Sequence, residues 1–245
     1  MSEPGVIYGR SGPREPEPGL VYGRNPFREL LDAGRRDIHE VWALPTLLDE
    51  EWLSTVRCKP RDKAQLTRLA GSPDHQGVVA ACQPYPYVDA EEVLAASGPV
   101  MVLDAVQDVH NLGAVARVAE TLGAAGLVIA DKGSPGVTPA VCKTSAGAVE
   151  HLRIARVPSL VAFVHDARRN GRRAVGADSD RGVDYRTSGL DARSIIVLGS
   201  EGEGLRPRLR SVCDEVVAIP MVGKVASLNL SVASAILLAR AVLSA

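Results

Sequence analysis

Arg117 is the first residue of this chain whose type and setting raise the question of chemistry. It interrupts the run "NLGAVARVAETLG", in which its neighbours are Ala and Val. From spacing alone, an ion pair with Glu120 at i,i+3 would explain the guanidinium. Asn111, six residues earlier, precedes the apolar periodicity and could cap the helix or contact a ligand. This segment alone does not decide between the structural and the functional interpretation.

A second segment whose residues could carry chemistry is the glycine-rich "LGSEGEGLRP". Gly199, Gly202 and Gly204 allow a backbone to approach a ligand closely, and Glu201 lies among them. The spacing G-x-x-G-x-G differs from the G-x-G-x-x-G dinucleotide fingerprint, and no G-K-[ST] follows. A phosphate-cradling P-loop is therefore not expected, and Glu201 alone decides nothing.

Short polar side chains gather in a third segment, "IPMVGKVASLNLSVASAILLAR". Ser227, Asn229 and Ser231 stand where a long apolar helix is expected to begin. One polar cap would suffice for that helix end. Three such side chains offer more hydrogen bonding than capping requires, which favours contact with a ligand.

The elements that must position these segments follow from the apolar pattern after residue 99. Apolar strands alternate with helices, which is typical of a parallel sheet covered on both faces. Ligands of such sheets bind beyond the carboxyl ends of the strands. The expected strands are 100–106, 126–130, 153–157, 172–177, 194–200 and 215–221, and the expected helices are 112–122, 160–170 and 228–243. Each of the three segments then begins at the carboxyl end of an expected strand.

The part before residue 99 divides into three pieces. Residues 1–18 are rich in Pro, Gly and Glu, and we expect a disordered tail. Residues 19–88 predict a small α/β domain, with strands at 38–44 and 76–85 and a helix at 25–35. Residues 89–98 are expected to link it to the larger domain, 99–245.

Composition limits the classes of function. No apolar run approaches the roughly 18 residues that span a bilayer, so we expect a cytoplasmic protein without a membrane partner. The four cysteines lie far apart, without C-x-x-C pairs, and are expected to be reduced. The five histidines are equally scattered, so we expect no metal site.

The net charge of −1 argues against a surface that is basic throughout. Basic residues nevertheless concentrate in three stretches, 57–68, 166–173 and 206–210. Such clusters can neutralise RNA phosphates, although a solvated surface is an equally good interpretation of each one.

The order of the motifs carries a family resemblance. N-L-G-x-x-x-R, G-S-E-G-x-G-L and I-P-M-x-G-x-x-x-S-L-N-x-S-x-A, with "CKTSAGAVEH" after the first, resemble the SpoU (TrmH-type) family of RNA 2'-O-ribose methyltransferases. "LVYGRNPFRELL" and "HQGVVA" resemble the L30e-like RNA-binding domain of the subgroup that methylates a guanosine of 23S rRNA. Val109 stands where that family usually has Pro.

The resemblance implies a trefoil-knotted (SPOUT-type) α/β catalytic domain with a parallel sheet, a homodimer, and S-adenosyl-L-methionine as cofactor. Residues carried over as cofactor contacts are Gly199, Ile219, Met221 and Leu228. Residues carried over to the catalytic site are Arg117, Asn111, Glu201, Ser227 and Asn229.

The implied reaction is methyl transfer to a ribose 2'-hydroxyl, in which Arg117 has two possible roles. It can give up a proton to an RNA phosphate and act as base, or stay charged and clamp that phosphate. The clamp is the smaller assumption, because a guanidinium is protonated near pH 7. Alternative substrates are tRNA and an antibiotic-target rRNA loop. The alternative class is a non-enzymatic RNA-binding protein on the same scaffold.

Overall fold

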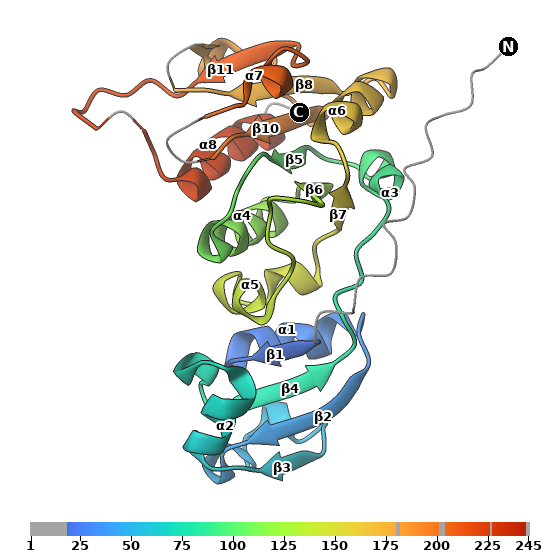
Figure 1. Cartoon of the computed structure of the whole chain (residues 1–245), viewed down its shortest axis with the longest axis vertical. Coiled ribbons are helices and arrows are strands. Elements are labelled where there is room, and N and C mark those ends of the chain that lie inside the picture. The colour runs from blue at the N-terminus through green and yellow to red at the C-terminus, as the bar shows by residue number, and fades with distance from the viewer. Residues whose placement is uncertain (1–18, 180–181, 201–203, 226, 244–245) are drawn as a thin grey trace, which may run out of the picture.

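The computed structural model describes residues 19–179, 182–200, 204–225 and 227–243 (Figure 1). The tail predicted at residues 1–18 lies outside these ranges. The described chain builds a small front sheet from its first quarter and a larger sheet from the remainder. The two sheets lie at opposite ends of the long axis in Figure 1.

The front sheet has four strands in the order β1-β4-β2-β3. Strand β4 pairs antiparallel with both β1 and β2, and β3 runs parallel to β2 at the edge. The short strand β3 was not predicted, because it falls within the basic stretch 57–68. The elements are β1 (Leu20–Tyr22), α1 (Arg24–Ala33), β2 (Ile38–Ala43), β3 (Cys58–Pro60), α2 (Lys63–Ala70) and β4 (Val78–Cys82), with short 3-10 turns at Pro45–Leu47, Glu51–Leu53 and Pro73–His75.

The larger sheet has seven strands in the order β7-β6-β5-β10-β8-β11-β9, and every pair is parallel. The parallel sheet predicted from the alternating pattern is therefore present. Its strands are β5 (Val100–Leu103), β6 (Gly126–Ala130), β7 (Ile154–Val157), β8 (Arg173–Ala177), β9 (Val183–Asp184), β10 (Ser194–Leu198) and β11 (Glu215–Ala218).

Helices cover both faces of this sheet, as fully apolar strands require. Along β5, Met101 and Leu103 enter one core while Val100 and Val102 enter the other. The first core contains α4 (Val109–Thr121), α5 (Pro139–Thr144) and α8 (Leu230–Leu243). The second contains α3 (Ala90–Ala95), α6 (Leu160–Arg169) and α7 (Pro207–Arg210). Helix α3 lies within the stretch expected to be a linker and packs against β6 and β7.

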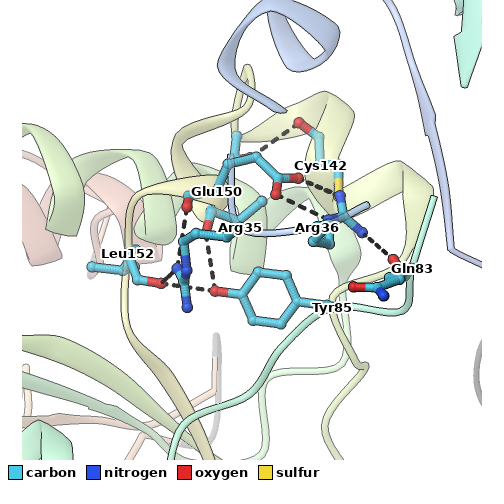
Figure 2. Close-up of polar contacts among 9 residues, drawn as sticks. Arg35, Arg36, Gln83, Tyr85, Cys142, Glu150 and Leu152 are labelled. Carbon is cyan, nitrogen blue, oxygen red and sulfur yellow. Dashed lines mark hydrogen bonds and ion pairs between the residues drawn. The ribbon is translucent and has the colours of Figure 1, made fainter. Parts of the chain in front are cut away.

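The front part joins the larger part through a buried polar cluster (Figure 2). The Arg36 guanidinium pairs with the Glu150 carboxylate, with Nε 3.1 Å from Oε2, and the two side chains are 2% and 1% exposed. The Tyr85 hydroxyl donates to the carbonyl oxygens of Val149 and Leu152 at 2.9 and 2.8 Å. One apolar core also runs through both parts. The parts therefore share an interior.

Arg35 and Cys142 complete this junction. Arg35 Nη1 donates to the carbonyl oxygens of Glu150 and Leu152, both at 3.1 Å. Burial, reinforced by the nearby Glu150 carboxylate, raises the pKa of the Cys142 thiol to about 12. Since the thiolate is the reactive form, Cys142 is expected to be chemically inert.

Structural contacts account for the basic stretch 166–173. Arg168 pairs with Asp214, Arg169 with Asp166, and Arg173 with Glu215. Arg172 donates to the carbonyl oxygens of Leu94, Ala96 and Gly98, at the end of α3. The four arginines of this stretch therefore all have partners within the described chain. In the described ranges, no helix has the length and apolarity to cross a membrane.

Candidate active site

A pocket of about 370 Å³, the glycine-loop pocket, lies where β8, β10 and β11 end and α8 begins. The four residues expected to contact a cofactor, Gly199, Ile219, Met221 and Leu228, all line it, together with Ser227. The other lining residues are Ala177, Asp178, Ser179, Leu198, Ser200, Gly204, Val217, Leu230 and Ala233. The structure thus brings together the four predicted cofactor contacts, which are up to 29 positions apart in the sequence.

Two glycines shape the wall of this pocket. A Cβ at Gly199 would overlap the carbonyl oxygen of Gly204, so the two strands of the loop approach more closely than a side chain permits. Gly204 itself has φ +65°, in the left-handed region that favours glycine. These glycines therefore allow the loop backbone to pack closely on itself, while their predicted close approach to a ligand stays a prediction. Glu201 lies outside the described residues.

A second pocket of about 370 Å³, the Asn111 pocket, adjoins the first and shares Ser200 and Leu230 with it. Its remaining residues come from the exit of β5 and the start of α4: Ala105, Val106, Gln107, Asp108 and Asn111. Ala105 has φ +55°, which is strained for a residue with a Cβ. Strain of this kind is common where a loop holds a functional position.

Asn111 does not cap α4, contrary to one of the two interpretations of the sequence. The helix begins at Val109, and Asp108 is its N-cap, with its carboxylate accepting from the His110 N–H at 2.8 Å. The Asn111 side chain instead meets Asn229, whose Nδ2 donates to Asn111 Oδ1 at 3.2 Å. Asn111 is therefore available to the pocket.

Asn229 both caps a helix and contacts Asn111, which lines the Asn111 pocket. It directly precedes α8, and its Oδ1 accepts from the Ser231 N–H at 2.9 Å and from the Ser231 hydroxyl at 2.6 Å. Its Nδ2 points the other way, to Asn111. One amide thus caps α8 and holds Asn111, while Ser227 is exposed at the glycine-loop pocket.

Arg117 lies elsewhere in the same chain. It is exposed and lines a separate cleft of about 320 Å³, the Arg117 cleft, with residues of α1 and of the turn after α5. Six residues of helix place it about 9 Å along α4 from Asn111 and roughly 120° away around the axis. Within the described chain, no ion pair joins Arg117 to Glu120, so that interpretation of its charge is wrong. The structure does not bring Arg117 to its own glycine-loop pocket.

Two buried carboxylates at strand ends were not singled out from the sequence. Asp104 follows β5, is fully buried and pairs with Arg206, whose Nε lies 2.9 Å from Oδ2. These hydrogen bonds raise the pKa of Arg206. Asp178 follows β8, lines the glycine-loop pocket and pairs with Arg210. An acid directly after an apolar strand was the sequence signal for both.

The two adjoining pockets can hold an extended ligand with apolar and polar parts. Val217, Ile219 and Leu228 supply apolar surface, whereas Asp178 and Ser179 supply polar groups. Across the described ranges, no set of three or more His, Cys, Asp or Glu side chains is placed to hold a metal ion.

Comparison with known families decides the kind of protein. The model of the SpoU rRNA Methylase family matches residues 98–239, and the model described as RNA 2'-O ribose methyltransferase substrate binding matches residues 20–88. The chain belongs to the SpoU rRNA methylase family. A Staphylococcus aureus protein assigned to the TrmH family of tRNA/rRNA methyltransferases is 34% identical to this SpoU-family chain over 242 residues, covering 95% of it and 93% of the relative.

Solved structures agree with this assignment. The SpoU methyltransferase AviRb from Streptomyces viridochromogenes is 27% identical, with a TM-score of 0.77 over 91% of this SpoU-family chain and 88% of AviRb. AviRb has also been solved in complex with AdoMet, at 25% identity and a TM-score of 0.76 over 90% and 88% of the two chains. A TrmH-family protein of Porphyromonas gingivalis, 23% identical, shares the fold, with a TM-score of 0.78 over 94% and 91% of the chains. The fold class predicted from the sequence is confirmed.

Proposed function

We propose that this SpoU-family chain transfers a methyl group from S-adenosyl-L-methionine to a ribose 2'-hydroxyl of structured RNA. The observation that carries the proposal is the gathering of Gly199, Ile219, Met221 and Leu228 around one pocket that adjoins the Asn111 pocket. The first would hold the cofactor and the second the target ribose. Both lie beyond the carboxyl ends of strands, where ligands of parallel sheets bind.

The glycine-loop pocket fits the cofactor chemically. Apolar side chains from β11 and the segment before α8 suit the adenine ring, and the backbone of Gly199 and Gly204 forms part of the pocket wall. The Asp178 carboxylate, which pairs with Arg210, adds a polar group to the wall of the pocket. S-adenosyl-L-methionine supplies an electrophilic methyl group when bound. The work of the protein is to orient the hydroxyl and remove its proton.

Asn111, Ser227 and Asn229 would orient the ribose and the loops around it. Asn111 Oδ1 already accepts from Asn229, which leaves its amide N–H groups for the substrate. Ser227 is exposed at the rim of the glycine-loop pocket. Glu201 keeps its proposed positioning role from the resemblance alone.

Arg117 would act on the pocket of a second copy of the chain. Its place on α4, away from the glycine-loop pocket of its own chain, supports a homodimer in which each copy completes the other's site. There we assign it the clamp role, in which its guanidinium binds an RNA phosphate beside the target nucleotide. This role requires no loss of its proton.

The front domain, proposed at residues 19–88, would bind the RNA, and the catalytic domain is proposed at 99–245. Along β3 and α2, Arg57, Lys63 and Arg68 are exposed, and no ion pair joins them to the described carboxylates. They form a basic edge that suits RNA phosphates. Lys59 differs, because it pairs with Glu40.

The substrate we favour is a guanosine of 23S rRNA, because the front domain resembles that of the corresponding subgroup. A tRNA or an antibiotic-target rRNA loop is the alternative, and ribosomal or transfer RNA as substrate fits the cytoplasmic location expected from the sequence. The test is to map 2'-O-methyl groups in rRNA and tRNA from cells with and without the protein. We expect one ribose to lose its methyl group, and identical maps would contradict the proposal.

A further inference from the structure

The strand order of the large sheet places three pockets in a row along one edge. The glycine-loop pocket lies at the ends of β8, β10 and β11, and the Asn111 pocket at the end of β5. Next in the order come β6 and β7, and a third pocket of about 570 Å³ opens beyond their ends. We call it the Lys132 pocket. Nothing in the proposed reaction accounts for it.

Cationic side chains surround the Lys132 pocket. Lys132 comes from the loop after β6, and Arg206 and Arg208 come from the start of α7. The other lining residues are Ala130, Pro158, Ser159, Leu160, Val161, Pro207 and Leu209. The lining thus contains three cations and no carboxylate among the described residues.

Two of these cations have no charged or hydrogen-bonding partner for their side chains within the described part of the chain. Lys132 and Arg208 are exposed, and neither forms an ion pair or side-chain hydrogen bond within the described part of the chain. The arginines of the stretch 166–173 differ, because carboxylates or carbonyl oxygens bind them. The basic stretch 166–173 is therefore explained by contacts within the protein. Of the stretches 166–173 and 206–210, only 206–210 leaves a positive charge available to a ligand, at Arg208.

Arg206 connects this pocket to the reaction site. Its guanidinium is held by the buried Asp104, the residue directly before Ala105 of the Asn111 pocket. Its side chain is still 59% exposed, so it faces outward while its position is fixed. A polyanion that enters the Asn111 pocket meets this row of cations at the neighbouring strand ends.

We propose that the Lys132 pocket binds backbone phosphates of the RNA strand that carries the target nucleotide. This inference rests on the proposed function, because it takes the occupant of the Asn111 pocket to be an RNA ribose. Lys132 and Arg208 contact successive phosphates, and Arg206 fixes the path between the two pockets. Phosphate contacts of this kind set register and orientation without reading the base.

The test uses the full chain and an unmodified 23S rRNA transcript. The variant Lys132→Glu/Arg208→Glu is compared with Arg153→Glu/Arg193→Glu, which makes the same change of charge at exposed positions before β7 and β10, on the opposite edge of the sheet. Transcript affinity is measured across a salt series. Affinity for S-adenosyl-L-methionine and thermal melting serve as folding controls.

We expect the Lys132/Arg208 variant to bind the transcript at least about tenfold more weakly, with the salt slope reduced by roughly 1.5 to 2. Its cofactor affinity should be unchanged, and the control variant should bind as wild type does. Equal affinity and slope for the two variants would overturn the inference.

The result also separates this inference from the proposed function. Wild-type protein that binds RNA through Lys132 and Arg208 but methylates no ribose supports the pocket and contradicts the reaction. Methylation that survives the double charge reversal with unchanged transcript affinity supports the reaction and overturns the pocket. Wild-type protein that binds no RNA overturns both.

Discussion

The amide of Asn229 donates from Nδ2 to Oδ1 of Asn111 at 3.2 Å, although the two residues are 118 positions apart. This hydrogen bond joins the segment after β5 to the segment before α8, and its acceptor Asn111 lines the Asn111 pocket. Because Oδ1 of Asn229 is occupied by Ser231, the orientation of the amide is fixed. The hydrogen bond to Asn111 requires an amide at position 229, because a carboxylate has no N–H to donate.

The variant Asn229→Asp tests the cap of α8 and the hydrogen bond to Asn111 independently. Aspartate still accepts from Ser231 and suits a helix N-terminus, so the free energy of unfolding should change by about 0.5 kcal/mol or less. It cannot donate to Asn111, so two acceptors would face each other and kcat should fall roughly tenfold or more. Thermal melting and single-turnover methylation measure the two effects. Wild-type turnover in this variant would rule out a positioning role for the link.

Arg117→Lys should lose most of the turnover and keep its affinity for S-adenosyl-L-methionine. Lysine retains the charge but not the planar, bidentate donor set, so we expect kcat/KM to fall roughly 100-fold or more. Methylation of an rRNA transcript and calorimetric cofactor binding are the measurements. Near-normal methylation would contradict both the base and the clamp.

Mixed dimers test whether Arg117 serves the second copy. Arg117→Ala leaves the glycine-loop pocket intact, and Leu228→Trp obstructs that pocket but leaves Arg117 in place. Each variant alone should be inactive. Mixed in equal amounts and reassociated, they should recover about a quarter of the wild-type rate, since half of the dimers then contain one complete site. A mixture as inactive as its components would place Arg117 in its own chain's site or outside catalysis.

Glu150→Gln should destabilise the protein more than removal of an exposed ion pair. It leaves the Arg36 guanidinium buried without a counter-charge, which costs about 3–5 kcal/mol. The control is Glu29→Gln, at the exposed Glu29–His151 pair between the same two parts, which should cost about 1 kcal/mol or less. Denaturant unfolding compares them. Similar losses would mean that the buried pair does not hold the junction.

His75 should make the front domain less stable in mild acid. Burial, with a smaller contribution from Lys63, lowers the pKa of His75 below its ordinary 6.5. Its Nδ1 accepts from the Gly77 N–H at 3.0 Å, which requires the neutral ring. Because the folded state favours the neutral ring, His75 contributes to the stability of the protein above pH 6.5. This contribution is lost as the pH falls through the pKa that His75 has in the folded state.

Melting temperatures from about pH 7.5 to about pH 5 check this prediction. The wild type should lose more stability over that range than His75→Gln, whose side-chain oxygen can still accept from Gly77. Parallel pH curves for the two proteins would show that another group controls the acid sensitivity.

The fold was largely predictable because apolar strands buried on both faces leave a strong pattern. Segment 194–200 predicted β10, which ends two residues earlier, and 160–170 predicted α6, which ends one residue earlier. Strand β9 was missed because it has only two residues, and α3 because its six residues lie in a stretch interpreted as a linker. Elements this short are stabilised by their tertiary partners, so local sequence carries little signal for them.

The candidate site was predictable only in part. Gly199 and Leu228 were assigned to one cofactor site by the family resemblance, and they line one pocket because both follow strands that end at the same edge. The position of Arg117 in a separate cleft depends on which face of α4 packs, which the motif N-L-G-x-x-x-R does not specify. Gly113 of that motif has a packing explanation as well, since a Cβ there would overlap the Thr144 side chain on α5.

The shared interior of the two parts has a consequence for how a target is chosen. A front sheet joined by a buried ion pair and a continuous apolar core does not swing on a tether. Under the proposed function, the front sheet would therefore hold the docked RNA element at a fixed distance from the reacting ribose. The methylated nucleotide would then be selected by that distance, and an RNA with nucleotides inserted between the two would present the wrong ribose.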